Sequence, residues 1–161
     1  MGTTEKADIF TVAQYGDIQT FTKKFYSVHD INQKHNGSSL LHYSIAGRRF
    51  DIAQFLLDHD IDVDMPNSDG QTPLHLIGTC QSLQVAEFLL QKGATPNIRD
   101  KYGNNALWTA VFNCKGKNYE MVELFMKYHP DVTTKNKAGR SPLDFASQVG
   151  DEKLICILQE R

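Results

Sequence analysis

The chain has 161 residues, 40% of them hydrophobic and 22% charged, and its formal net charge is −2 at pH 7. This composition fits one domain with a continuous core and excludes a strongly basic nucleic-acid-binding protein. No segment approaches the run of about 18 apolar residues that a membrane span needs, and residues 1–8 do not form a signal peptide. Lys6 stands where a myristoylation signal after Gly2 requires Ser or Thr.

Helices are expected in pairs along the chain, because apolar residues recur at helical spacing between turn-forming residues. Thr72 and Ser82 are placed to cap the two helices of the third pair. Pro73 suits a first helical position and Gly93 a left-handed helix end. In chain order, the expected helices cover about 5–14 with 17–26, 39–47 with 50–58, 73–80 with one starting after Ser82, 105–113 with 119–128, and 141–149 with 151–159.

Four glycines mark a repeating unit. Gly37, Gly70 and Gly103 are 33 residues apart, and Gly139 follows after another 36. A fixed period of this length indicates stacked structural repeats. Glycine also adopts the positive φ that a tight hairpin tip requires. The sequence therefore predicts a hairpin tip at each of the four glycines.

The residues after these glycines repeat a motif. They read Q-T-P-L-H-L-I-G after Gly70, R-S-P-L-D-F-A after Gly139, S-S-L-L-H-Y-S-I-A after Gly37 and N-N-A-L-W-T-A-V after Gly103. Residues 85–94 read V-A-E-F-L-L-Q-K-G-A. The chain therefore resembles the ankyrin family, whose signature is T-P-L-H-x-A followed by V-x-x-L-L-x-x-G-A.

The resemblance covers about residues 7–161 and implies an all-α solenoid of about five helix-turn-helix repeats with hairpin tips. We expect a single domain over 1–161, in which the first and last repeats act as caps because one side of each meets water. The expected repeats are 5–33, 34–66, 67–99, 100–135 and 136–161.

Two histidines are candidates for acid–base catalysis, but they occupy the position of the motif His. In ankyrin repeats this side chain bonds to backbone between hairpins, so the resemblance implies a structural role for His42 and His75. Trp108 and Asp144 stand at the same position in the last two repeats, a variation that suits packing and not catalysis. No phosphate-binding loop, zinc spacing or nucleophile elbow is present, so we expect neither enzymatic activity nor a cofactor.

An alternating acidic run resembles a calcium-binding loop: Asp58, Asp60, Asp62 and Asp64. Counted from Asp60, however, Met65 stands where the loop needs Gly, and Gln71 stands where it needs Glu. We therefore expect a solvated acidic edge and no metal site.

The resemblance implies that partner proteins bind a concave face formed by the first helices and the hairpin tips. On the first helices the expected contact residues are Tyr43, Leu76, Thr79, Cys80, Thr109, Phe112, Asn113 and Phe145. On the tips they are Arg99, Lys101, Tyr102, Lys135, Lys137 and Arg140. These basic tips favour an acidic partner, whose association they would steer. Two alternatives stay open: the aromatic residues pack neighbouring repeats, and the basic residues only solubilise the surface.

The fourth repeat departs most from the family pattern. It has three extra residues within 113–119, Trp108 replaces the motif His, and His129-Pro130 replaces Gly-Ala. The hydrogen bonds that the His would make are therefore in doubt there. The insertion either is tolerated, since loop length costs little, or makes a special contact.

Residues 101–113 and 135–146 also resemble short stand-alone bacterial ankyrin proteins, some of which are immunity proteins for secreted toxins. This resemblance implies that the partner is a toxin domain and that the concave face blocks its active site or substrate path. For a basic toxin the acidic edge is the better docking surface. One alternative is a eukaryotic-type inhibitor or adaptor of a kinase or transcription factor, and another is a small-molecule binder with a deep pocket.

The expected setting is cytoplasmic. The chain has three cysteines, Cys80, Cys114 and Cys156, which lie in different repeats. An odd number in separate repeats favours reduced thiols. We expect a monomer that contacts neither nucleic acid nor membrane directly.

Overall fold

The computed structural model describes residues 7–80 and 82–160. Within these ranges it contains ten helices and one two-stranded hairpin. The strands are β1 (Lys34–His35) and β2 (Ser38–Ser39). The helices are α1 (Ile9–Tyr15), α2 (Ile18–Phe25), α3 (Leu40–Ala46), α4 (Phe50–Leu57), α5 (Pro73–Cys80), α6 (Leu83–Gln91), α7 (Ala106–Cys114), α8 (Glu120–Met126), α9 (Pro142–Val149) and α10 (Glu152–Gln159).

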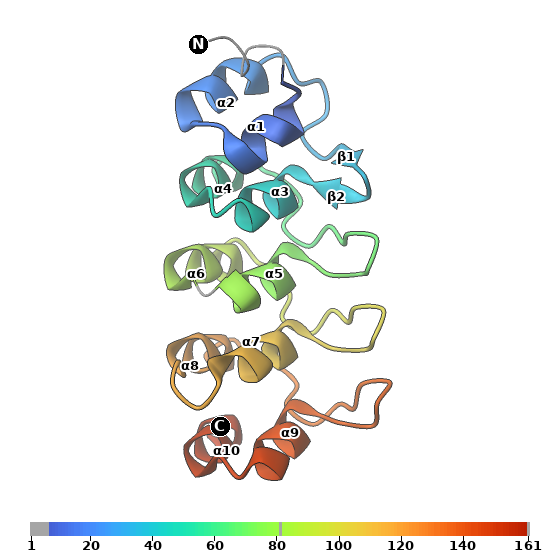
Figure 1. Ribbon diagram of the computed structural model, residues 1–161, viewed down its shortest axis with the longest axis vertical. Helices are drawn as coiled ribbons and strands as arrows, with labels where there is room; N and C mark the ends of the chain where they lie inside the picture. The colour runs from blue at the N-terminus through green and yellow to red at the C-terminus, as the bar shows by residue number, and fades with distance from the viewer. Residues whose placement is uncertain (1–6, 81, 161) are drawn as a thin grey trace.

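The helices form two stacks that run along the long axis of the molecule (Figure 1). The inner helices α1, α3, α5, α7 and α9 pack on one another in chain order, and the outer helices α2, α4, α6, α8 and α10 do the same behind them. We call each inner helix with its outer helix a layer, numbered one to five along the chain. The hairpins project from the inner stack, away from the outer helices. The expected all-α solenoid is confirmed.

Acidic side chains fix the helix starts of the first layer. The Asp8 carboxylate accepts hydrogen bonds from the backbone N–H groups of Phe10 and Thr11, at 2.9 and 3.0 Å. A cap of this kind satisfies amide groups that the first turn leaves without partners. The helix expected from residue 5 therefore begins at Ile9 instead, although residues 5 and 6 themselves lie outside the described chain. Asp17 caps α2 in the same way through the N–H of Thr20, at 2.8 Å.

One expected cap is absent. Ser82 occupies the N-cap position of α6, but its side chain makes no capping hydrogen bond. The Thr72 hydroxyl lies 2.9 Å from Nδ1 of His75, so it engages the motif histidine. At Gly93 the expected left-handed helix end is present, with φ of +91°.

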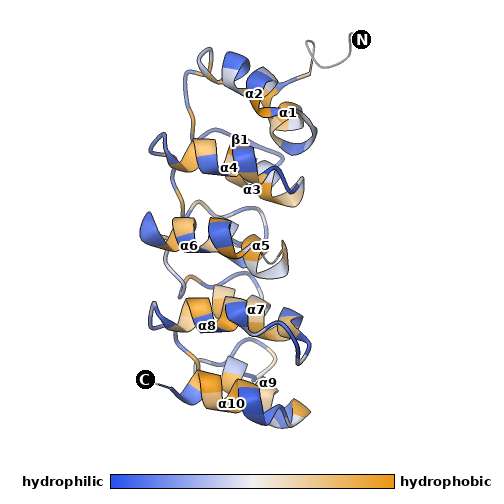
Figure 2. Ribbon diagram, turned by 90° about the vertical axis from the view of Figure 1, so that its left-hand side faces the viewer, coloured by the Kyte–Doolittle hydropathy of each residue, from blue (hydrophilic) through white to orange (hydrophobic). Residues whose placement is uncertain are grey.

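The core is a continuous apolar strip between the two stacks. Leu41 of α3 is fully buried, and so are the corresponding leucines of the next two layers, Leu74 and Leu107. From the outer helices, Leu56, Leu89 and Phe125 are also fully buried. Figure 2 shows hydrophobic segments in every layer of the stack. Burial of such side chains is the main favourable term in folding, so each layer depends on its neighbours for stability.

The first hairpin differs from those that follow. Lys34 pairs with Ser39 and His35 with Ser38 across a two-residue turn. That turn has positive φ at both central residues, 48° at Asn36 and 76° at Gly37. Asn-Gly is the preferred sequence for this type I′ geometry, whose twist matches that of the paired strands.

The three later hairpins share an internal support that the sequence analysis missed. In each, one Asn or Asp side-chain oxygen accepts two backbone N–H groups of its own hairpin, at 2.9–3.1 Å. The tip glycine of each hairpin has φ of 75–80°, as the repeat spacing led us to expect. The supporting residues are Asn67, Asp100 and Asn136, three positions before Gly70, Gly103 and Gly139.

Replacing Leu74 with Ala should lower the free energy of unfolding by about 2–5 kcal/mol, because it leaves a cavity in the centre of the core. Urea denaturation followed by circular dichroism measures this loss. The matched control is Leu83→Ala, because Leu83 is 41% exposed and its loss should cost less than about 1 kcal/mol. If the two substitutions lowered the free energy of unfolding equally, Leu74 would not lie in the core as described.

Candidate functional site

The motif histidine of the third layer joins two consecutive hairpins. The backbone N–H of Thr72 donates to Nδ1 of His75 at 3.1 Å, so this nitrogen accepts and carries no proton. Nε2 therefore carries the proton and donates to the carbonyl of Asn104 at 3.1 Å. The ring is buried, with relative exposure of 1%. Both ring nitrogens of His75 are thus used within the protein.

His42 makes the same connection one layer earlier. Its Nδ1 accepts the N–H of Ser39 at 3.3 Å, and its Nε2 donates to the carbonyl of Gln71 at 2.9 Å. Burial lowers the pKa of both His42 and His75, because the charged imidazolium loses its hydration. The neutral form is also the one that accepts the backbone N–H. These are structural contacts between layers.

The fourth layer replaces this histidine by a different device. Asn105 accepts the N–H of Trp108 through Oδ1 at 2.9 Å and donates through Nδ2 to the carbonyl of Asp131 at 2.8 Å. Its amide therefore caps α7 and also bonds to the segment leading to the fifth layer. In the last layer Asp144 accepts the N–H of Ser141 at 2.9 Å and closes a capping box. Asn105 therefore links the fourth layer to the fifth, but at the carbonyl of Asp131 and not within the next hairpin, where the motif His bonds in the earlier layers.

A second set of hydrogen bonds runs behind the hairpins. In three successive layers, a side-chain oxygen accepts a backbone N–H of the following layer at 2.7–2.9 Å. The pairs are Asn32 with Asp62, Asp64 with Thr95, and Asn97 with Asp131, the acceptor named first.

This set involves part of the expected acidic edge. Asp64 is an acceptor in it, and the Asp62 carboxylate accepts the N–H of Asp64 at 3.0 Å. Asp58 lies 3.9 Å from Lys92, and Asp60 is exposed with φ of 55°. Two of the four acidic side chains therefore also stabilise the backbone, a role that the sequence analysis did not anticipate.

The expected contact residues on the inner helices lie together on one surface, which we call the inner face. It is the side of α1, α3, α5, α7 and α9 that remains accessible beside the hairpins. Thr79 and Phe112 are exposed there, whereas the other expected residues are half-buried, namely Tyr43, Leu76, Cys80, Thr109, Asn113 and Phe145. Asp144 is the one Asp, Glu, Lys or Arg in the five inner helices.

Aromatic residues on the inner face also pack between layers. The Tyr43 ring lies 5.2 Å from Phe10 of the first layer, and its hydroxyl donates to the carbonyl of His35 at 3.3 Å. Phe145 lies 5.6 Å from each of Trp108 and Phe112 of the preceding layer. The same aromatic side chains therefore pack between layers and remain partly accessible to a partner.

The basic residues of the hairpins are partly engaged within the protein. Lys101 lies 2.6 Å from Asp69 and 5.0 Å from the centre of the Tyr102 ring. Arg99 donates to the carbonyls of Gly103 and Lys135, which joins two hairpins.

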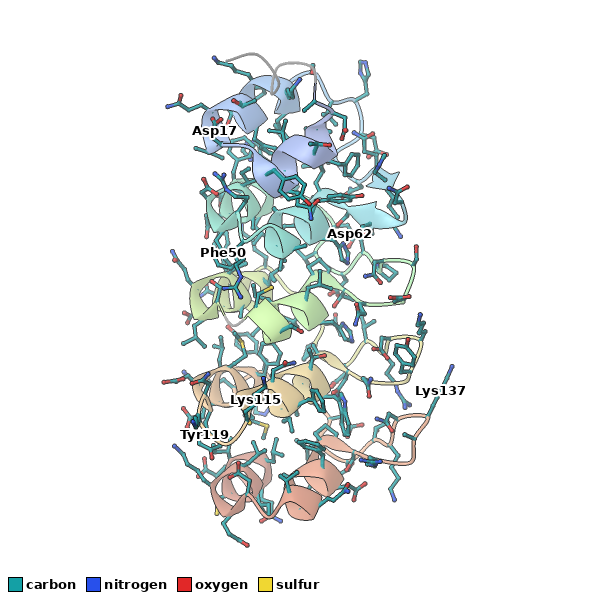
Figure 3. All side chains as sticks on the ribbon, in the orientation of Figure 1. Asp17, Phe50, Asp62, Lys115, Tyr119 and Lys137 are labelled. Atoms are coloured by element: carbon teal, nitrogen blue, oxygen red, sulfur yellow. The ribbon has the colours of Figure 1, made fainter. Side chains whose placement is uncertain are left out.

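Further along, Arg140 donates to Gln148 of α9 at 3.2 Å, and Lys135 lies 3.9 Å from Asp144. Lys137 extends from the tip of the last hairpin (Figure 3). Sequence reasoning grouped these cations but missed that several also hold the hairpins in place.

The inserted loop of the fourth layer is anchored to the fifth. The Tyr119 hydroxyl donates to the Asp151 carboxylate at 3.0 Å, and the Lys153 ammonium lies 4.3 Å from the centre of the Tyr119 ring. Lys115 and Gly116 begin the loop with positive φ of 50° and 67°. The insertion is therefore an ordered element that contacts α10.

Neither a metal site nor a membrane span is visible in the described residues. Over 7–80 and 82–160, no three His, Cys, Asp or Glu side chains are grouped so as to hold a metal ion. None of the helices in these ranges has the length and apolar character needed to cross a bilayer. The three cysteines are free, and burial raises the pKa of the Cys80 and Cys114 thiols.

Residues 9–100 match the family model described as "Ankyrin repeats (3 copies)". The chain belongs to the ankyrin-repeat family. The structure extends the same pairing of inner and outer helices beyond this match, through α7 to α10.

Curated relatives include ankyrin-repeat proteins of viruses and bacteria. A putative ankyrin repeat protein of fowlpox virus is 29% identical over 75% of this chain and 20% of its own length. One of Rickettsia felis is 32% identical over 67% of this chain and 50% of its own length. A probable 26S proteasome regulatory subunit, p28 of Saccharomyces cerevisiae, is 28% identical over 80% of this chain and 57% of its own length. This ankyrin-repeat chain thus spans about a fifth to somewhat more than half of these relatives.

The stability of the protein should fall as the pH is lowered from about 7. The pKa values of His42 and His75 lie below 6.5 in the folded chain, so the unfolded chain takes up protons first. Urea denaturation at several pH values between about 5 and 7 gives the free energy of unfolding at each pH, and so its slope against pH. The His75→Gln protein is the comparison, because it should be less stable at pH 7 but should lose less stability on acidification. If the free energy of unfolding of the His75→Gln protein had the same slope against pH as that of the original chain, His75 would not be a buried neutral group.

Proposed function

We propose that this chain is a non-catalytic binding protein whose inner face holds and inhibits a partner protein. The observation that carries the proposal is the chemistry of that face. Its five helices combine exposed or half-buried apolar side chains with a single charged residue, Asp144. Protein interfaces have such a centre, low in charge and rich in aromatic residues, surrounded by a polar rim.

The charges beside this face favour an acidic partner. Lys137 and Arg140 lie on the last hairpin, and Lys115 and Lys117 lie on the loop at the other end of the inner helices. Figure 3 shows Lys137 and Lys115 on opposite sides of the inner stack. Opposite charge on a partner speeds its association and orients it. The acidic residues Asp58 and Asp60 form the alternative docking surface, which a basic partner would use.

The absence of catalysis is part of the proposal. His42 and His75 use both ring nitrogens in contacts with backbone and hydroxyl groups, so neither is free to exchange a proton with a substrate. The yeast relative is named as a regulatory subunit of the proteasome, which supports a role in binding proteins. A small-molecule binder is less favoured, because a helical face with one charged residue, Asp144, offers few polar groups to orient a small ligand.

Two kinds of partner fit an inhibitor of this form. The first is a toxin domain, in which case the chain is an immunity protein that covers the active site of the toxin. The second is a kinase, a transcription factor or a larger assembly, in which case the chain is an inhibitor or adaptor. We propose a cytoplasmic setting, because the three free cysteines suit a reducing compartment. We also propose that the chain is a monomer on its own.

The identity of the partner separates these two hypotheses. The tagged chain is used to capture proteins from its source organism, and mass spectrometry identifies those that are retained in equal amount. A secreted toxin or nuclease fragment whose activity falls on binding supports the immunity hypothesis. A kinase, transcription factor or multi-subunit assembly supports the adaptor hypothesis and contradicts the first.

Replacing Thr79 with Glu should weaken binding of the captured partner by about tenfold or more, since it places a negative charge in the middle of the inner face. Surface plasmon resonance at two salt concentrations measures the effect. Gln91→Glu is the matched control, because Gln91 is exposed on the outer helix α6 and gains the same charge. Equal affinities for the two variants, at unchanged Tm, would place the interface elsewhere.

A further inference from the structure

The inserted loop of the fourth layer creates a pocket at one end of the inner face. The pocket has a volume of about 340 Å³ and lies between α7, α9 and the loop. Its lining includes Phe112, Phe145, Val149, Leu154, Lys115 and Asp151. Most of this lining is apolar, with one basic and one acidic side chain at the edge.

The apolar lining is more exposed than its neighbours in other layers. Phe112 is 57% exposed and Val149 is 55% exposed, although both are large hydrophobic residues. The corresponding position of α5 carries Thr79 where α7 carries Phe112, and Cys80 where α9 carries Val149. The last two layers therefore present apolar surface to solvent where the third layer presents small side chains.

The wall of the pocket is held in place before any partner arrives. The hydrogen bond of Tyr119 to Asp151 and the position of Lys153 over the Tyr119 ring fix the loop against α10. Figure 3 shows Tyr119 beside α8 and Lys115 at the end of α7. A preformed wall reduces the ordering cost of binding, which is one of the main costs of association.

The two charged side chains of the pocket, Asp151 and Lys115, differ in whether they have a partner within the protein. The Asp151 carboxylate accepts the Tyr119 hydroxyl and the N–H of Leu154 at the start of α10, where the helix end favours a negative charge. Lys115 takes part in no ion pair with the described residues, and neither does Lys117 two residues later. The Asp151 carboxylate is thus engaged within the protein, whereas the ammonium of Lys115 has no carboxylate partner among the described residues.

We infer that this pocket binds a partner segment in which an aromatic or branched aliphatic side chain is followed by a carboxylate. The apolar side chain enters between Phe112, Phe145 and Val149, and the carboxylate pairs with the ammonium of Lys115. This inference rests on the proposed function, since it names the part of the inner face that contributes most to the binding of the partner. It also gives the insertion a role beyond a tolerated change in loop length.

The test uses a phage library of random 12-residue peptides selected on the full chain, with an unrelated protein of similar charge as the counter-selection. Selected peptides should share an aromatic or branched aliphatic residue followed by Asp or Glu. The strongest of them is synthesised with a fluorophore, and its affinity is measured by fluorescence polarisation. Phe112→Ser should weaken binding by about tenfold or more, whereas Tyr26→Ser should leave it unchanged, because Tyr26 is a still more exposed aromatic residue that lies outside the inner helices.

A charge exchange tests the carboxylate separately. Lys115→Asp keeps a residue type that tolerates positive φ, so the loop geometry is retained. This variant should lose affinity for the acidic peptide and gain affinity for the same peptide with Lys in place of its carboxylate. A variant that favours the acidic peptide as strongly as the original chain overturns the pairing.

The outcomes separate this inference from the proposed function. Peptides that are insensitive to Phe112→Ser but sensitive to Thr79→Glu overturn the pocket and leave the inner face as the binding surface. Peptides whose binding changes with neither substitution contradict both the pocket and the inner face as the binding surface. A selection that enriches no shared sequence also overturns the pocket. Val149→Ser provides a second pocket variant if Phe112→Ser lowers the Tm, since Val149 lies at the exposed end of α9.

Discussion

The fold depends on satisfying the backbone of one hairpin with a side chain from the layer before it. A hairpin that projects from a helical stack leaves carbonyl and amide groups that need partners. In the second and third layers an imidazole Nε2–H fills this need, and in the fourth an asparagine amide bonds to the segment that leads into the last layer. Apolar packing of the helices supplies most of the stability, but these polar contacts fix the spacing and direction in which the layers stack.

Much of this architecture could be predicted from the chain because it follows from local and periodic features. The glycine spacing indicates the period, and the T-P-L-H type motif indicates where the four inner helices after α1 begin. The Asn36-Gly37 turn was also open to prediction, since this dipeptide is the strongest short signal for a two-residue hairpin. The expected start of the first helix near residue 5 was wrong for a physical reason: the Asp8 carboxylate caps the helix, which therefore begins at Ile9.

The candidate site was less predictable, because its properties depend on residues that are far apart in the chain. Lys101 meets Asp69 across 32 positions, and Tyr119 meets Asp151 across the same number. Neither contact can be derived from composition or helical spacing. The expected inner-helix residues do lie on one face, since the repeat register determines which positions point there. Which of them carry a partner stays a prediction that binding experiments decide.

The main helix contacts join neighbouring layers, and this has a mechanical consequence. When the two ends of such a stack are pulled apart, the force passes through each junction between layers in turn. The junctions are therefore loaded in series, and the weakest opens first while the others stay closed. A solenoid of this kind extends in steps and can recover one layer at a time, whereas a domain whose ends lie side by side gives way at once.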